Sequence, residues 1–314
     1  KAVFVLENGL MGERTGTGIF NGTNRQSYAG LAGGFGTVAF GRQYTPQHLF
    51  TAAVDPFGKS GLGSASNVLV QDARLNNLAA YISPNWGGFS FVAGYTFNGT
   101  GLSVPSAPLV TSGNENLAND GDVRVWAIAP TFTWNKLFLG ANYHTAQVYF
   151  RGADNVKAFN AWDFFASYDF GVAKVGATIG QRRTKRDLLN VVGAPGTGDA
   201  KILQWMVGAT FRITPNDSIL ASYNYARQND FADAGKAKLS QWAVGYEHAL
   251  SKRTVLYAQF AMQDKNGKFR DHGNGFATVS TSPAVKGSVA TSYDGSDDTR
   301  GYRRGLALGF RHDF

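Results

Sequence analysis

The chain has 314 residues, with 39 glycines, 23 phenylalanines, 13 tyrosines and no cysteine. This composition favours strands and tight turns over helices, and it excludes a disulfide framework and a thiolate metal site. The net charge of +8 indicates attraction to anions but does not distinguish nucleic acid, anionic lipid and small anionic solutes. Because no apolar run reaches the ~18 residues of a membrane-spanning helix, no such helix is expected.

Most apolar segments alternate between apolar residues and small or polar ones, which is the period of a β-strand. In Leu203–Phe211 the odd positions are all apolar, whereas the even positions hold Gln204, Met206, Gly208 and Thr210. Segments of this kind follow one another along the chain at 37–43, 74–83, 89–95, 162–168, 174–180, 203–211 and 219–226. In 123–132 and 255–262 both parities are mostly apolar, so the pattern does not say which face is which.

The connections between these segments are alternately short and long. Short ones fall at 33–36, 85–88, 135–136, 169–173, 214–217 and 251–253, and long polar ones at 9–24, 44–73, 98–121, 150–159, 184–200, 229–235 and 265–301. In an up-and-down antiparallel sheet, this order puts every short turn at one end. Roughly fourteen strands result, each near the ~9–11 residues that cross a bilayer at a tilt.

So many strands predict a single all-β domain over residues 1–314, closed into a transmembrane antiparallel barrel, because closure removes the exposed edges. Small polar side chains cannot fill a wide barrel, which leaves an aqueous lumen, so the apolar face must contact lipid. Aromatic residues lie beside the short turns, as at a membrane interface: Tyr81, Phe89, Phe132, Trp134, Tyr168, Phe170, Phe211, Tyr246 and Tyr257. A sandwich or propeller core is the alternative, but no blade-length repeat is present.

The segment 44–73 is a connection of 30 residues that has no clear helical or strand period. It carries a DPFG turn at 55–58 and only three charged residues, Asp55, Lys59 and Asp72. A structureless loop of this length inside a compact domain is usually functional. A disordered loop would carry more charge, so we expect this one to pack against other parts of the protein.

The last residues, LALGFRHDF, place Leu306, Leu308, Phe310 and Phe314 on one face, and they resemble the closing strand of Gram-negative outer-membrane proteins. Four further blocks resemble the trimeric general porins, particularly those of β-proteobacteria: KAVFVLENG, SYAGLAGGFGTVAFGRQY, NNLAAYISPNWGGFSFVAGY and LSKRTVLYAQFA. In that family the first of these blocks resembles the third strand. The resemblance therefore implies two strands upstream of Lys1 and a barrel of sixteen strands.

In these porins the third long loop folds into the barrel and narrows it, and a ladder of basic side chains faces it from the wall. The resemblance implies that Arg25, Arg42 and Arg74 form this ladder and that Glu7 is the wall acid beside them. It places Asp55 and Lys59 on the loop side of the constriction, since the DPFG turn is similar to the family's loop tip.

Alternation allows a first check of these arginines. Arg25 shares its parity with Ser27 and Ala29, opposite Tyr28, which predicts a lumenal side chain. Arg74 has the parity of Asn76, again lumenal. Arg42 has the parity of apolar residues and needs a β-bulge to turn inward.

The resemblance implies an outer-membrane porin, a water-filled channel for passive diffusion of small anionic and neutral solutes with an anion preference. It also implies a homotrimer in contact with membrane lipid and lipopolysaccharide, with no cofactor. Two alternatives stay open: a solute-specific channel for phosphate or an organic anion, and an outer-membrane barrel enzyme, for which no nucleophile motif is visible.

The remaining charged and metal-binding side chains carry no separate prediction of a site. The five histidines are too scattered in the sequence for a metal centre. The basic run at 182–186 has the charge of a nucleic-acid patch, but in a barrel it is better explained as a rim that attracts anions. We expect Arg182 and Arg183 at the rim of the barrel, in open electrolyte, and no nucleic-acid partner.

Overall fold

The computed structural model describes residues 1–8, 24–58, 61–71, 73–97, 122–149, 155–191, 198–229, 236–266 and 300–313. Within these residues, fourteen strands form one antiparallel sheet in which each strand pairs with its neighbours in the chain. The strands are β1 (Ala2–Asn8), β2 (Asn24–Gly33), β3 (Gly36–Tyr44), β4 (Arg74–Ile82), β5 (Phe89–Thr96), β6 (Asp122–Trp134), β7 (Leu137–Tyr149), β8 (Val156–Asp169), β9 (Ala173–Thr184), β10 (Ala200–Arg212), β11 (Asp217–Gln228), β12 (Ala237–Ala249), β13 (Thr254–Asn266) and β14 (Arg300–His312).

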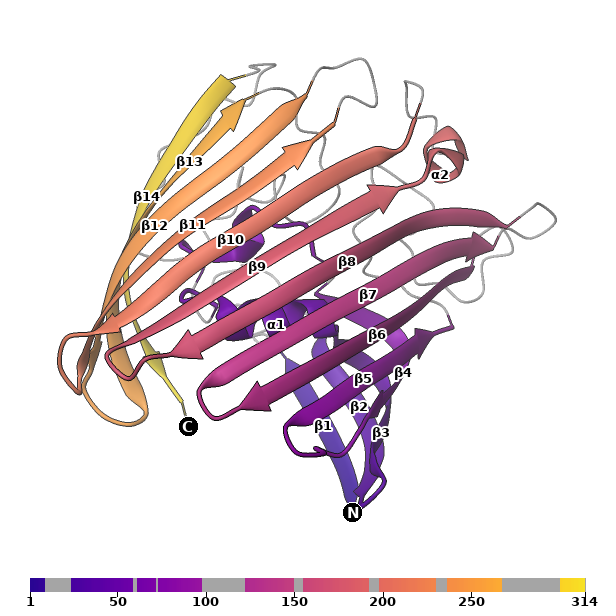
Figure 1. Cartoon of the computed structure of the whole chain (residues 1–314), viewed down its shortest axis with the longest axis horizontal. Coiled ribbons are helices and arrows are strands. Elements are labelled where there is room, and N and C mark those ends of the chain that lie inside the picture. Colours follow the sequence, from indigo (N-terminus) through magenta and orange to yellow (C-terminus); the bar gives the residue numbers. More distant parts are fainter. Residues whose placement is uncertain are drawn as a thin grey trace, which may run out of the picture.

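The sheet curves around the segment that follows β3, and the short turns all lie at the same end of the strands (Figure 1). Two α-helices and one 3-10 helix complete the described structure: α1 (Pro46–Val54), α2 (Arg186–Val191) and the 3-10 helix η1 (Ala65–Asn67). In the described part of the chain, no helix has both the length and the apolar character needed to cross a membrane. The predicted up-and-down order of the strands is confirmed.

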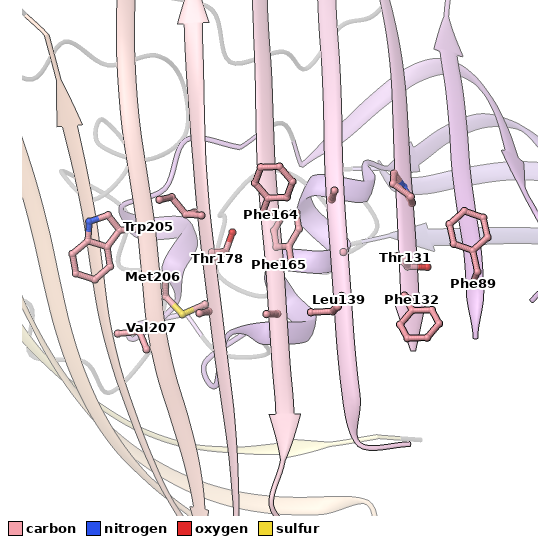
Figure 2. A pocket seen from close by; sticks show the side chains of 16 residues that line it. Phe89, Thr131, Phe132, Leu139, Phe164, Phe165, Thr178, Trp205, Met206 and Val207 are labelled. Atoms are coloured by element: carbon pink, nitrogen blue, oxygen red, sulfur yellow. The ribbon is translucent and has the colours of Figure 1, made fainter. Parts of the chain in front are cut away.

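The sheet is apolar outside and largely polar inside, the reverse of a water-soluble protein. On β10, Val207 is 45% exposed whereas Gln204 is only 3% exposed. On β8, Phe164 is 56% exposed and the adjacent Phe165 is 3% exposed; Figure 2 shows these two rings among the side chains around a hollow in the wall between β5 and β10. An exposed face of this kind is adapted to lipid, as the alternation predicted.

The aromatic residues expected beside the short turns are mostly exposed. Those with exposed rings are Phe89, Phe132, Trp134, Tyr168, Phe170, Phe211 and Tyr246. Tyr257 differs, because it is paired in register with Glu247, which lines a hollow inside the barrel together with Asp55. It therefore lies on the inner face.

The segment 44–73 contains a helix that the sequence pattern did not predict. Helix α1 begins after Thr45, whose side chain accepts a hydrogen bond from the backbone N–H of His48 at 3.2 Å, and Pro46 occupies its first turn. These are standard start signals for a helix. The helix lies inside the barrel and contacts the wall at β7, β8 and β9. Because of this, its apolar residues do not form the single stripe from which a helix is usually predicted.

Glutamine side chains of the wall hold this segment in place. Gln204 of β10 pairs with the backbone of Val70, accepting from its N–H at 2.7 Å and donating to its carbonyl at 3.0 Å. Gln241 of β12 donates to the carbonyl of Gly63 at 3.0 Å. From the helix, Gln47 donates to Asp163 of β8 at 2.8 Å. The packing that was expected of this segment is therefore present, and it involves strands across the middle of the sheet.

Glycines on the inner face give the segment room to approach the wall. A Cβ atom at Gly176 would lie 2.0 Å from the carbonyl oxygen of Val54, and one at Gly208 would lie 2.6 Å from Cδ of Pro56. The two glycines are neighbours in register on β9 and β10. Any larger residue there would move the segment away from the wall.

Candidate functional site

Two of the predicted arginines meet at Tyr44, the last residue of β3. Arg25 donates from Nη2 to the Tyr44 hydroxyl at 2.5 Å, and Cζ of Arg74 lies 5.2 Å from the centre of the Tyr44 ring. The same tyrosine also has a partner in α1, since its ring stacks on His48 with 4.8 Å between centroids. Tyr44 therefore joins the basic residues of the wall to the helix inside the barrel.

Glu7 provides the acidic side chain of this cluster. Its Oε1 lies 2.5 Å from Nε of Arg25, and its Oε2 accepts from Gln26 at 3.1 Å. Gln26 also accepts from the backbone N–H of Tyr44 at 3.4 Å. The ion pair is partly exposed, so it contributes little to folding stability; its effect is to orient the guanidinium group.

Arg42 lies at a register shift of the kind that its parity required, and it is close enough to Arg74 for the two positive charges to interact. The register of β3 and β4 shifts between Gly41 and Gln43, and Asn77 on the facing strand has a positive φ of 51°. Nη1 of Arg42 donates to Oδ1 of Asn76. Asn76 lies within the irregularity, between the paired residues Leu75 and Leu78 of β4, so the two polar side chains meet where the ladder is interrupted.

The side chain of Arg25 contacts Glu7 on the inner side, but the parity from which this was predicted is the outward one. Ser27, which has the parity of Arg25, pairs with Leu6, and Leu6 is 76% exposed on the outer face. Tyr28 lines a hollow against α1 and is the lumenal residue. Arg25 reaches Glu7 because the register of β1 and β2 shifts after Glu7, which turns the next side chain on β2 inward.

The cluster thus brings together three guanidinium groups and one carboxylate: Arg25, Arg42, Arg74 and Glu7. His48 adds no positive charge at neutral pH. Its burial lowers its pKa, and the nearby Arg74 and Arg25 lower it further. The excess of positive charge in this cluster can attract anions and repel small cations.

Asp55 lies elsewhere, buried within the segment 44–73. It accepts hydrogen bonds from the backbone N–H groups of Phe57 at 2.9 Å and Ala65 at 2.8 Å. Burial raises the pKa of Asp55 to about 6. These contacts fold the segment, and they give Asp55 no contact with the arginine cluster. Lys59 lies outside the described residues.

Tyr44, Gln26 and His48 were not singled out from the sequence. Tyr44 immediately precedes the Thr-Pro start of α1, and this position at the junction of wall and helix is the signal that could have identified it. Aromatic residues occur on both faces of the sheet, such as Phe164 outside and Phe165 inside, so composition alone did not separate Tyr44 from the rest.

The expectation for Arg182 was wrong, because this residue does not lie in open electrolyte. It is 1% exposed, and its Cζ lies 3.5 Å from the centre of the Phe159 ring. It has the inward parity of Thr178 and Gly180. Arg183, its neighbour, is the exposed one and pairs with Asp199.

Comparison with known proteins now identifies the family. Residues 1–268 match the family described as Gram-negative porin. The chain belongs to this family. The porin is 28% identical over 270 residues to outer membrane porin protein 32 of Delftia acidovorans, covering 83% of this chain and 69% of that protein. It is 26% identical over 285 residues to an outer membrane porin protein of Bordetella pertussis, covering 82% of this chain and 71% of that protein.

Solved structures show the same fold. The anion-selective porin from Comamonas acidovorans superposes with a TM-score of 0.70 at 24% identity, covering all of this chain and 84% of that one. OmpT of Vibrio cholerae superposes with a TM-score of 0.59 at 17% identity, covering 92% of this chain and 80% of that one. The predicted family, the all-β porin fold and the outer-membrane location are confirmed. The protein is a channel for passive diffusion, and the family indicates a channel rather than an enzyme.

Proposed function

We propose that this porin prefers anions and that Arg25, Arg42 and Arg74 set the preference at a constriction formed with the segment 44–73. The observation that carries the proposal is the convergence of Arg25 and Arg74 on Tyr44. Tyr44 is also stacked on the helix inside the barrel. The basic residues therefore stand where the segment 44–73 leaves the wall.

The physical basis is a field in a confined space. Charges close to a low-dielectric wall act on an ion over a few ångströms with little screening, whereas open electrolyte screens charges over about 8–10 Å. An anion entering this space exchanges part of its hydration for guanidinium N–H donors. The name of the Comamonas acidovorans porin, which is called anion-selective, supports the same direction of preference.

For the assembly, we propose one barrel over residues 1–314 and a homotrimer in contact with lipid and lipopolysaccharide. The first and last strands carry strongly exposed apolar side chains: Phe4 and Leu6 on β1, and Leu308 and Phe310 on β14. These side chains support contact of both strands with an apolar surface, either lipid or a second copy of the chain. Cross-linking in mild detergent tests the trimer, and a product that runs only as a monomer would contradict it.

The experiment that tests the anion preference is the zero-current potential of reconstituted channels in a salt gradient. We expect the sign that indicates higher permeability for chloride than for potassium, at low and at raised salt. A cation-selective channel would contradict the proposal while leaving the porin fold intact. Neutral hydrophilic solutes of similar size are expected to pass by diffusion alone, without saturation.

A further inference from the structure

An apolar hollow lies between α1 and the inner face of the wall, from β2 to β7. Its volume is about 130 Å³. Leu49 and Phe50 line it from the helix, and Leu78, Ala80, Val92 and Ala127 line it from β4, β5 and β6. The interior of a porin barrel is ordinarily polar, so this group of apolar side chains on the lumenal face requires an explanation.

The hollow is not simply the packing surface between the helix and the wall. Where the segment 44–73 is anchored, the wall presents polar groups, such as Asp163 to Gln47 and Gln204 to Val70. Within the hollow, in contrast, Leu49 of the helix stays 49% exposed. Apolar surface therefore remains accessible from the lumen at this place.

One edge of the hollow is formed by the basic cluster. Tyr44 and Gln26 line the hollow, and the same two residues contact Arg25 and Glu7. Arg74 lies over the Tyr44 ring. An apolar recess and an excess of positive charge are thus separated by the width of one tyrosine side chain.

We propose that the hollow and the cluster together form a binding site for small monocarboxylates with an apolar body, of the size of benzoate. The carboxylate would face the arginines, which bind carboxylates through charge-assisted hydrogen bonds, and the body would enter the hollow. The hollow of about 130 Å³ is slightly smaller than an apolar protein cavity of about 150 Å³ that accepts benzene, and because it opens to the lumen at Leu49 the ring need not be fully enclosed. The inference rests on the proposed anion preference and adds a substrate class to it.

The test measures the block of chloride current in reconstituted channels by added benzoate, acetate and benzamide. Benzoate is expected to block saturably at a concentration at least about tenfold below that of acetate, because the recess buries the ring and leaves the methyl group of acetate little to contact. Benzamide, which has the same ring without the charge, is expected to block weakly or not at all.

Two variants locate the effect. Val92→Thr keeps the shape of the side chain but places a hydroxyl in the hollow, and Leu49→Gln introduces a polar group from the half-exposed helix position. The ratio measured is the blocking concentration of acetate divided by that of benzoate. Each variant is expected to lower this ratio by about threefold, since polar groups weaken apolar contact. The matched control is Val207→Thr on the outer face of β10, where Val207 is exposed and the ratio should stay unchanged.

The outcomes separate this inference from the proposed function. If the wild-type channel is anion-selective but benzoate and acetate block alike, the binding site is refuted and the anion preference stands. If the channel is cation-selective and benzoate does not block, both are refuted. Equal effects of Val92→Thr and Val207→Thr on the ratio would also overturn the site.

Discussion

Arg25 and Tyr44 are joined by a hydrogen bond of 2.5 Å between Nη2 and the phenol oxygen, although they lie on different strands and the phenol ring also stacks on the internal helix. The bond couples the geometry of the basic wall to that of the segment 44–73. A change in the position of α1 would therefore move the guanidinium groups as well. This coupling is the reason that we expect charge and loop variants to act on the same conductance properties.

Replacing Arg74 with glutamine is expected to shift the zero-current potential toward cations, and the shift should persist when the salt concentration is raised. The charge lies in the confined cluster, where screening is incomplete. Arg183→Gln is the control, because this side chain is exposed and paired with Asp199; its smaller effect should fade with salt. An unchanged zero-current potential in the Arg74 variant would contradict the proposal that Arg74 lies at the constriction.

Glu7 and Arg25 are expected to have opposite effects on selectivity. Glu7→Gln removes the carboxylate of the cluster and should strengthen the anion preference, whereas Arg25→Gln leaves that carboxylate without its 2.5 Å partner and should weaken the preference more than Arg74→Gln does. The double variant should fall between the two single ones, with an interaction that a double-mutant cycle measures. Strictly additive shifts in potential would argue against direct pairing in the working channel.

The strand pattern could be predicted from the sequence because lipid on one side and water on the other impose a period of two. Prediction was weakest where that period is interrupted. Arg25 and Arg42 both lie at register shifts, and a bulge reverses the side on which a residue points without any signal in the parity of its neighbours.

Helix α1 and the burial of Arg182 were missed for a related reason. Both lie inside the barrel, where a helix can be apolar on several sides and a charged group can pack on an aromatic ring, as Arg182 does on Phe159. Neither situation produces the single apolar stripe that sequence patterns detect. The start of the helix at Thr45 and Pro46 was nevertheless readable from local capping chemistry.

Gly176→Val is expected to loosen the segment 44–73, because its Cβ would overlap the carbonyl oxygen of Val54 at 2.0 Å. We expect faster proteolysis within that segment and a thermal unfolding midpoint lower by several degrees, as for overpacking that costs about 1–3 kcal/mol. Ala177→Val is the matched control: it is the next residue of β9 and belongs to the hollow in the outer wall, so neither quantity should change. Equal sensitivity of both variants would contradict the close approach.

Gln204→Leu removes the side chain that pairs with both backbone groups of Val70. Leaving a buried donor and acceptor without partners costs about 1–3 kcal/mol, so the Val70 amide should exchange its hydrogen at least about tenfold faster. Gln263→Leu is the comparison, since Gln263 donates to the carbonyl of Asn67 at 3.5 Å and to Gln241 at 2.8 Å rather than to Val70, so the Val70 amide should be less affected. If the Val70 amide keeps its protection in Gln204→Leu, the hydrogen bonds of Gln204 do not hold this part of the segment in place.

Asp55 predicts a pH dependence of the folded segment. Burial raises its pKa to about 6, above the ordinary value of 3.8, so the folded segment binds a proton more tightly than the unfolded one. The resulting stabilisation is complete below pH 3.8 and is lost as the pH rises through 6, a change on the order of 3 kcal/mol. Protection factors of the Ala65 amide, corrected for intrinsic exchange, should therefore be higher at pH 5 than at pH 7.5.

Two variants assign this pH dependence to a residue. In Asp55→Asn the protection factors should be independent of pH, because the titrating group is gone, and at pH 7.5 they should not fall below those of the wild type, because the neutral amide carries no desolvation penalty for a charge. Lys174, Glu247 and Arg311 line the same hollow as Asp55, so Glu247→Gln serves as the control for a neighbouring carboxylate and should retain the slope. A slope that disappears in Glu247→Gln, or persists in Asp55→Asn, would assign the titration to another group.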